Sequence, residues 1–150
     1  MPTEIIPRLW VGDMLDAGNA GLINDLNITM VVNCTPDVPF INSYLTNIRL
    51  SVDDNRQPDQ IRMLYENMNR IVDRIHLTLS TNGTVLVHCH AGRQRSCAII
   101  AGYLMKYGGV GPADAVKYIR SRRSVAFFPE VNFRPALVEY WSDLQSNKLI

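Results

Sequence analysis

Hydrophobic positions along the chain follow two periods, one typical of strands and one typical of helices. Short apolar or alternating runs that are bounded by turn-forming residues predict strands. These runs lie at residues 8–12, 28–34, 47–54 and 84–88. The runs at 28–34 and 84–88 are rich in β-branched residues, which favours strands buried inside a sheet.

A second set of segments has an apolar residue at every third or fourth position, as amphipathic helices do. The longest runs from about Gln60 to Thr81 and ends at Asn82-Gly83. We expect Asp59 to cap the start of this helix. Further helices are predicted within residues 17–27, 96–109, 112–123 and 132–144. Strands that alternate with helices predict a layered α/β domain.

Length and composition narrow the class of protein further. A chain of 150 residues with 47% hydrophobic content predicts one globular domain, residues 1–150. The net charge of +1 gives no bulk attraction to nucleic acid, so no nucleic-acid partner is expected. No apolar run reaches the ~20 residues of a membrane span, and no secretory signal is visible. We therefore expect no membrane anchor.

The cysteines bear on both location and metal binding. There are three, without the spacing of a disulfide framework, which favours a reducing compartment: cytoplasmic, and also nuclear. His88, Cys89 and His90 are adjacent, so in a strand their side chains alternate between faces. No C-x-x-C or second His pair completes four ligands, and we expect no metal site.

The stretch "VLVHCHAGRQRS", residues 85–96, places chemistry at the end of a strand. Ligands of open α/β sheets bind beyond the carboxyl ends of strands. The loop here runs into a helix N-terminus, and its successive N–H groups can form an anion site there. Gly92 permits the necessary backbone geometry. Arg95, six positions after Cys89, can return its planar fork over the same anion.

The same surroundings are expected to lower the pKa of the Cys89 thiol, since helix N-termini and cations stabilise a thiolate. His88 and Ser96 flank it, and a hydrogen bond from Ser96 would steady the thiolate as a leaving group. Taken alone, Cys89 reads as a small buried hydrophobic residue and Arg95 as a solvated charge. Together they predict a thiolate nucleophile inside a phosphate cradle.

"HCHAGRQRS" resembles the H-C-x-x-G-x-x-R-S/T signature of the cysteine-based protein tyrosine phosphatases. The upstream stretch "LWVGDMLDA…INDLNITMVVNCT" is similar to the dual-specificity branch, and the resemblance covers nearly the whole chain. It implies a compact α/β fold with a central mixed, mostly parallel sheet of about five strands flanked by helices. It also implies an enzyme that uses no metal or other cofactor.

By this resemblance, Cys89 attacks phosphorus and forms a phosphocysteine. Arg95 and the backbone amides of residues 90–95 bind the phosphate oxygens. The resemblance thus gives a substrate-binding set formed by His90, Ala91, Gly92, Arg93, Gln94 and Arg95. A catalytically inactive phosphate-binding module is the alternative, but such relatives typically lose the cysteine or the arginine, and both are present.

The family also uses an aspartic acid that protonates the departing oxygen, on a loop that follows a strand before the cysteine. The sequence "LSVDDNRQPDQI" offers Asp53 and Asp54, of which Asp54 lies 35 positions before Cys89. Continued alternation from Leu50 and Val52 favours Asp54. Asp53 stays the alternative, and a solvated strand end is the ordinary interpretation of the pair.

Phosphorylated protein, at phosphotyrosine and phosphoserine or phosphothreonine, is the substrate that the resemblance favours. His90 and Arg93, basic at the first and fourth variable loop positions, also occur in phosphatases of phosphoinositides and of phosphatidylglycerophosphate. A lipid or an RNA 5′-phosphate is therefore the alternative. Equally, Arg93 can point outward or pair with an acidic residue, and a largely neutral His90 would add little charge.

The stretch "YIRSRRSVAFFPEVNF" is similar to a family region that shapes the rim of the site. Pro129 and Phe133 match it. Glu130 stands where the family usually has Asn, and Ser124 where Pro is frequent. Substrate preference is the property that these departures affect.

Cys34 and Cys97 suggest a redox hypothesis. A thiolate of low pKa is easily oxidised, and a neighbouring thiol can trap it as a reversible disulfide. Cys34 ends a predicted strand that we expect beside the Cys89 strand, whereas Cys97 is expected to face the core. The alternative is that both are ordinary buried cysteines.

Overall fold

Five strands form one sheet in the order β1-β2-β5-β3-β4 in the computed structural model, which describes residues 1–146. The strands are β1 (Thr3–Ile6), β2 (Leu9–Gly12), β3 (Met30–Asn33), β4 (Thr46–Arg49) and β5 (Val85–His88). Only the β1–β2 pair is antiparallel, while β5 pairs in parallel with both β2 and β3. The predicted mixed, mostly parallel sheet is therefore confirmed.

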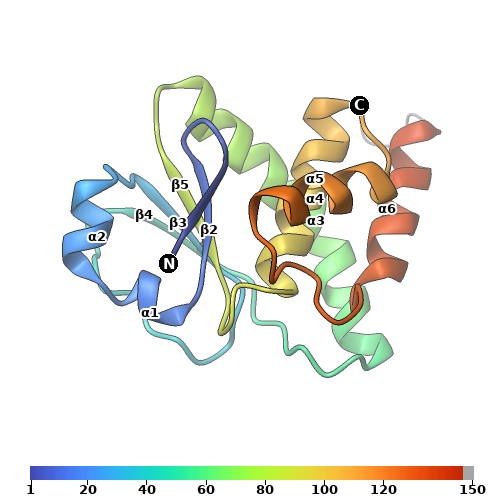
Figure 1. The fold of residues 1–150 in the computed structure, drawn as a ribbon, viewed down its shortest axis with the longest axis horizontal. Helices are drawn as coiled ribbons and strands as arrows, with labels where there is room; N and C mark the ends of the chain where they lie inside the picture. The colour runs from blue at the N-terminus through green and yellow to red at the C-terminus, as the bar shows by residue number, and fades with distance from the viewer. Residues whose placement is uncertain (147–150) are drawn as a thin grey trace.

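Helices cover both faces of this sheet (Figure 1). They are α1 (Met14–Ala17), α2 (Ala20–Asp25), α3 (Pro58–Ser80), α4 (Arg95–Gly108), α5 (Pro112–Arg122) and α6 (Arg134–Gln145). The two short helices lie on one side of the sheet and the four longer ones on the other. This layering leaves the central strand β5 buried on both faces.

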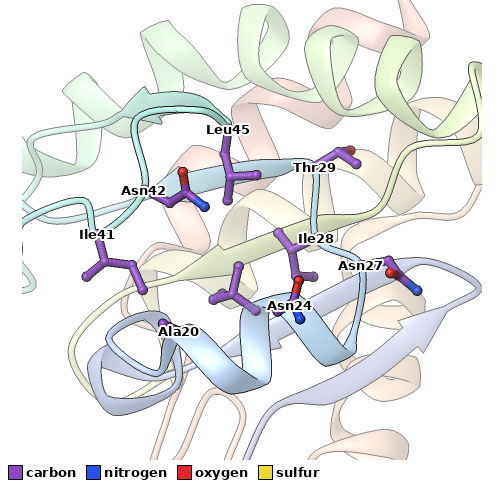
Figure 2. A pocket seen from close by; sticks show the side chains of 9 residues that line it. Ala20, Asn24, Asn27, Ile28, Thr29, Ile41, Asn42 and Leu45 are labelled. Carbon is purple, nitrogen blue, oxygen red and sulfur yellow. The ribbon is translucent and has the colours of Figure 1, made fainter.

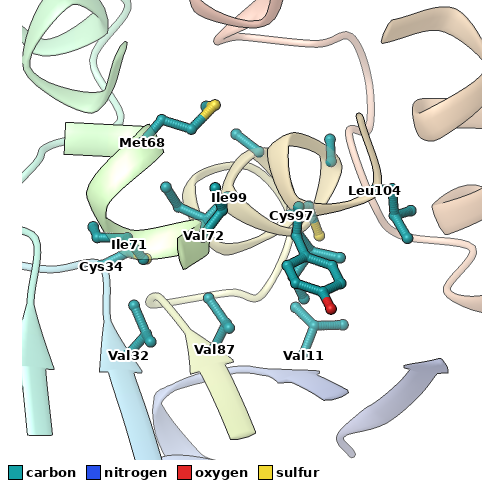
Figure 3. Packing of buried hydrophobic residues seen from close by; sticks show 14 of the residues in the cluster. Val11, Val32, Cys34, Met68, Ile71, Val72, Val87, Cys97, Ile99 and Leu104 are labelled. Atoms are coloured by element: carbon teal, nitrogen blue, oxygen red, sulfur yellow. The ribbon is translucent and has the colours of Figure 1, made fainter. Parts of the chain in front are cut away.

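The alternation of side chains along the strands creates two separate hydrophobic clusters. Val11, Val32 and Val87 point toward α3 and α4, where they meet apolar residues such as Val72 and Ile99 (Figure 3). The intervening positions point to the other face, toward α1 and α2. Parallel strands with apolar residues on both faces are expected where helices cover both sides.

The helix predicted within residues 17–27 is present as α2, and a further helix that was not predicted, α1, precedes it. Each begins at a residue whose side chain caps it: Asp13 accepts from the backbone N of Asp16, and Asn19 from that of Leu22. Asp and Asn are strong N-caps and here start two helices rather than one.

The prediction that Asp59 caps the long helix is wrong. The N-cap of α3 is Gln57, which makes no side-chain capping bond. Pro58 follows it at the first helical position, which suits proline because that N–H would have no helical partner. Asp59 therefore lies inside the first turn, where its charge is favourable toward the helix dipole.

The strand predicted over residues 47–54 is shorter in the structure, because β4 ends at Arg49. Beyond it the backbone turns, and the N–H of Val52 donates to the carbonyl of Leu50 at 2.9 Å. Leu50 and Val52 are nevertheless buried, as the alternation predicted.

Strand β1 was not predicted; its link to β2 uses Arg8 at φ 67° rather than a glycine.

Candidate active site

The loop after β5 lies at the carboxyl end of the central parallel strand and leads directly into α4. Gly92 in this loop has φ 65°. A Cβ built there would lie 2.7 Å from the carbonyl oxygen of Gly12 and 2.6 Å from Nη2 of Arg123. Only glycine fits, because both the backbone angle and the close contacts exclude a side chain.

Arg123 holds this loop in place through hydrogen bonds from its guanidinium, a role that the sequence did not predict. Its guanidinium is buried; Nε donates to the Gly92 carbonyl at 2.8 Å, and Nη1 donates to the Met1 carbonyl and to Thr3 Oγ1. A buried arginine must satisfy its donors, and here backbone and hydroxyl oxygens do so. Nothing local in the sequence marks Arg123 out from its neighbour Arg122.

Cys89 is 2% exposed, and its Sγ lies 3.2 Å from Ser96 Oγ. Burial opposes ionisation of the thiol. The Ser96 hydroxyl, the backbone N–H of Ser96, the charge of Arg95 and the backbone N–H of Arg93 oppose this effect and together lower the pKa of Cys89 below its ordinary value. The expectation of a stabilised thiolate is thereby supported, since hydrogen bonds to the charged form favour it.

Arg95 is 6% exposed, and its Nη1 donates to the carbonyl of Val52 at 2.8 Å. Its Nε is buried and has no hydrogen-bond partner among the described residues. A buried donor left unpaired is costly, so it marks a place where an acceptor is expected. An anion between Arg95 and the amides of the loop would supply that acceptor.

The remaining loop side chains point in different directions. Ala91 and Arg93 are exposed, and so is His90, whose Nε2 donates to Asp37 Oδ1 at 2.8 Å. This bond lowers the pKa of the Asp37 carboxyl. Gln94 is buried and its side chain turns away to residues 128–132. Of the predicted substrate-binding set, Gln94 therefore has only its backbone available to the site.

His88, the last residue of β5, is buried beneath the loop. Burial lowers its pKa to about 4, so the imidazole is neutral near pH 7. Its Nδ1 lies 3.3 Å from the Cys89 carbonyl oxygen. A neutral histidine at this place orients the backbone of the loop and adds no charge to it.

The structure distinguishes the two candidate acids. Asp54 Oδ1 accepts a hydrogen bond from Asn132 Nδ2 at 2.9 Å, and Asn132 in turn donates its backbone N–H to Gln94 Oε1 at 3.0 Å. Asp54 is thus connected to residues 89–94, the loop between β5 and α4, which is called the phosphate loop. Asp53 instead donates its backbone N–H to Gln60 Oε1 at the start of α3. Both carboxylates are exposed.

Cys34 and Cys97 are free thiols and fully buried near Cys89. Burial raises the pKa of each of them well above its ordinary value, and repulsion from a Cys89 thiolate adds to this effect. They are therefore protonated while Cys89 is the thiolate.

Within residues 1–146 no cluster of three or more His, Cys, Asp or Glu side chains is arranged to hold a metal ion.

A separate pocket of about 330 Å³ lies between α2 and the 41–45 segment (Figure 2). Its side chains are apolar residues, the amides of Asn24, Asn27 and Asn42, and the hydroxyl of Thr29. No charged side chain and no thiol lines it, which distinguishes it from the Cys89 loop. None of the described helices is both long and apolar enough to cross a membrane.

A sequence model described as "Dual specificity phosphatase, catalytic domain" matches residues 9–143. The chain belongs to this family. Human "Dual specificity protein phosphatase 1" is 28% identical over 144 residues, which cover 95% of this chain but 38% of that protein. "Dual specificity protein phosphatase 1B" of Arabidopsis thaliana is 29% identical over 147 residues, covering 97% of this chain and 84% of the relative.

Solved structures agree with this family. Human DUSP28 has a TM-score of 0.85 at 26% identity, with 96% of this chain and 95% of that chain covered. DUSP15 has a TM-score of 0.86 at 26% identity, covering 99% and 94%. The predicted fold class is therefore confirmed. The chain spans well under half the length of the human relative.

Proposed function

We propose that this dual-specificity phosphatase domain hydrolyses phosphotyrosine and phosphoserine or phosphothreonine in proteins through a phosphocysteine on Cys89. The observation that carries the proposal is one loop that holds both a thiol of lowered pKa and the unpaired, buried Nε of Arg95. The first ionises more readily to a thiolate nucleophile than an ordinary cysteine does, and the second is a donor for a phosphate oxygen.

In the first step the Cys89 thiolate attacks phosphorus, and the bond between phosphorus and the ester oxygen breaks. Asp54, protonated at this stage, gives its proton to the departing oxygen, so the product leaves as an alcohol or phenol. Arg95 and the loop amides bind the other phosphate oxygens, where charge is largest in the transition state.

In the second step water attacks the phosphocysteine, and the Asp54 carboxylate takes up one of its protons. The sulfur–phosphorus bond breaks and the thiolate is restored, with inorganic phosphate as product. The Ser96 hydroxyl, 3.2 Å from Sγ, donates to the sulfur as negative charge returns to it. Asp54 is then protonated again for the next cycle.

The charges around the loop favour a protein substrate over a polyphosphorylated lipid headgroup. His90 at the first variable loop position already bonds Asp37, an exposed carboxylate beside the loop. That carboxylate would repel further phosphates at this position. Exposed Phe128, whose carbonyl contacts the loop through Gln94, gives the rim an apolar side chain instead.

The test compares initial rates of phosphate release from a doubly phosphorylated Thr-x-Tyr peptide, a soluble inositol polyphosphate and a 5′-phosphorylated RNA. We expect the peptide to be hydrolysed fastest and Cys89→Ser to abolish all release. Faster hydrolysis of the inositol phosphate would assign the exposed His90 and Arg93 to a lipid headgroup. Faster hydrolysis of the RNA would overturn the protein substrate in the same way.

We also propose a cytoplasmic or nuclear location, because three buried free thiols suit a reducing compartment. Imaging of a fluorescent fusion, with fractionation as a second measurement, tests this. Signal from a secretory compartment would contradict it.

A further inference from the structure

The segment 128–132 is fastened to the phosphate loop by buried contacts. Gln94 Nε2 donates to the carbonyl of Glu130 at 2.7 Å and to that of Phe128 at 3.3 Å, and Gln94 Oε1 accepts from the backbone N–H of Asn132 at 3.0 Å. Just before the segment, the N–H of Phe127 donates to the Arg93 carbonyl. Gln94 is only 5% exposed, so these bonds are protected from water.

The same segment contacts the loop that carries Asp54 at two points. Asn132 Nδ2 donates to Asp54 Oδ1 at 2.9 Å. Two residues away, Arg56 Nη1 and Glu130 Oε1 form an ion pair at 2.5 Å. Residues 128–132 therefore join the two loops. Gln94 of the phosphate loop bonds to this segment, and so do Asp54 and Arg56 of the acid-bearing loop.

From these contacts we infer that Asn132 is a positioning residue that holds Asp54 over the phosphate loop, with the Arg56–Glu130 pair as a second tether. The inference rests on the proposed function, because it concerns the proton transfer in that reaction. It gives Glu130, which replaces the usual family Asn, the role of holding the acid-bearing loop. It gives the side-chain amide of Asn132, two positions further along the chain, the role of holding Asp54.

A neutral amide suits this position because it can keep its bond throughout the reaction. Asn132 donates to Asp54 Oδ1 whether the carboxyl group is protonated or ionised, provided that the proton resides on Oδ2. A cation at the same place would favour the ionised form and oppose the acid role. The pairing with Glu130 occupies the charge of Arg56, the nearest arginine along the acid-bearing loop.

The experiment measures kcat/KM, which reports the reaction only up to formation of the phosphocysteine, on two substrates that differ in their need for an acid: phenyl phosphate, with a poor leaving group, and p-nitrophenyl phosphate, with a good one. For Asn132→Ala we expect kcat/KM on phenyl phosphate to fall roughly tenfold and that on p-nitrophenyl phosphate about twofold, within the ~10²–10⁴-fold that a positioned acid contributes. Asn132→Gln, which keeps the amide donor, should restore part of the loss.

A double-mutant cycle separates positioning from structure. In an Asp54→Asn background, Asn132→Ala should cause no further loss on phenyl phosphate, because the acid is already absent. Thermal unfolding of each variant confirms that it is folded. An equal loss on both substrates, or a loss that persists in the Asp54→Asn background, would overturn the inference.

The second tether has its own matched control. Glu130→Gln should lower kcat/KM on phenyl phosphate about twofold to threefold at low salt and less at high salt, since an exposed ion pair is screened. Glu139→Gln, which breaks an exposed pair with Arg62 between α3 and α6, should have no such effect. Equal behaviour of the two variants would remove Arg56–Glu130 from the inference.

The outcomes also distinguish this inference from the proposed function. If the wild-type protein releases no phosphate in a manner that depends on Cys89, both are wrong. If the wild-type protein is active and the Asn132 variants lose both substrates equally, the inference alone is wrong.

Discussion

At the scale of single residues, the site depends on how the Cys89 thiolate is stabilised against the cost of burying it. The Ser96 hydroxyl is the largest of the favourable contributions to the lowered pKa, ahead of the charge of Arg95. We therefore expect Ser96→Ala to raise the pKa of Cys89 and to slow its alkylation by iodoacetate near neutral pH. A hydrogen bond to a charged group contributes about 1.5–3 kcal/mol, which corresponds to roughly tenfold or more in rate.

The measurement is the alkylation rate of Cys89 as a function of pH, followed by mass spectrometry. The midpoint of the profile should move to higher pH in Ser96→Ala, and the rates should converge at high pH where both thiols are ionised. Cys89→Ser should remain unlabelled, because burial raises the pKa of the Cys34 and Cys97 thiols and keeps them protonated. An unchanged midpoint would show that the helix N-terminus and Arg95 stabilise the thiolate without the hydroxyl.

The choice between the two aspartates is also decided by single contacts. Asp54 is joined to the phosphate loop through Asn132, whereas Asp53 is tied by its backbone to Gln60. Asp54→Asn should lower kcat/KM on phenyl phosphate by about 10²-fold, at the lower end of what general acids contribute. Asp53→Asn should change it by less than about threefold. The reverse order would transfer the acid role to Asp53.

At the scale of elements, the sequence predicts what is determined locally. The β-branched run that forms β3 and the long apolar period of α3 were both found, and so was the loop from Cys89 to Ser96, whose chemistry lies within a few consecutive residues. The hairpin from β1 to β2 was not. Pro7 favours a turn, but the next position has positive φ and is occupied by Arg8, where glycine or asparagine would have marked the turn clearly.

The pairing of β3 with β5 bears on the redox hypothesis. The register sets Asn33 opposite His88, so Cys34 and Cys89 follow at the same level of two neighbouring strands. The N–H of Cys34 donates to the His88 carbonyl at 2.8 Å. We expect peroxide to convert the Cys89 thiolate to a sulfenic acid, which the Cys34 thiol then attacks to form a disulfide with release of water.

Mass mapping after peroxide treatment checks this. A Cys34–Cys89 bridge should form in the wild-type protein and in Cys97→Ser, and Cys34→Ser should instead accumulate sulfinic acid at Cys89. The bridge should protect activity that a reductant then restores. Sulfinic acid at Cys89 in the wild-type protein without any bridge, or a bridge to Cys97, would contradict the assignment.

At the scale of the whole molecule, the site is assembled from segments that are distant in the sequence. Gln94 bonds to residues 128–132, and Arg123 reaches from the end of α5 to both the N-terminal residues and Gly92. The hydrophobic periodicity of the sequence cannot predict such contacts, because no local pattern specifies which buried oxygen a distant side chain will bond. They make the geometry of the loop dependent on the fold as a whole.

That dependence links folding stability to pH through His88, buried at the centre of the molecule. Burial lowers its pKa in the folded state to about 4, against an ordinary value of 6.5. Between these two values the unfolded chain binds a proton that the folded protein does not, so stability falls as pH decreases from about 6.5 to about 4. Below pH 4 this group causes no further loss. Because a tenfold change in proton affinity corresponds to about 1.4 kcal/mol, the full effect is of order 3 kcal/mol.

Urea unfolding at pH 7 and pH 5 measures this effect. The wild-type protein should lose about 2 kcal/mol of unfolding free energy between these values, because more than half of the interval between the two pKa values lies above pH 5. His88→Gln should lose much less, since it removes the group that binds the proton. His76→Gln is the matched control, because His76 on α3 is only partly buried and bonds Tyr103 of α4, away from the phosphate loop, so this variant should leave the loss unchanged. An equal loss in all three proteins would mean that carboxylates, and not the histidine beneath the phosphate loop, make the folded state sensitive to acid.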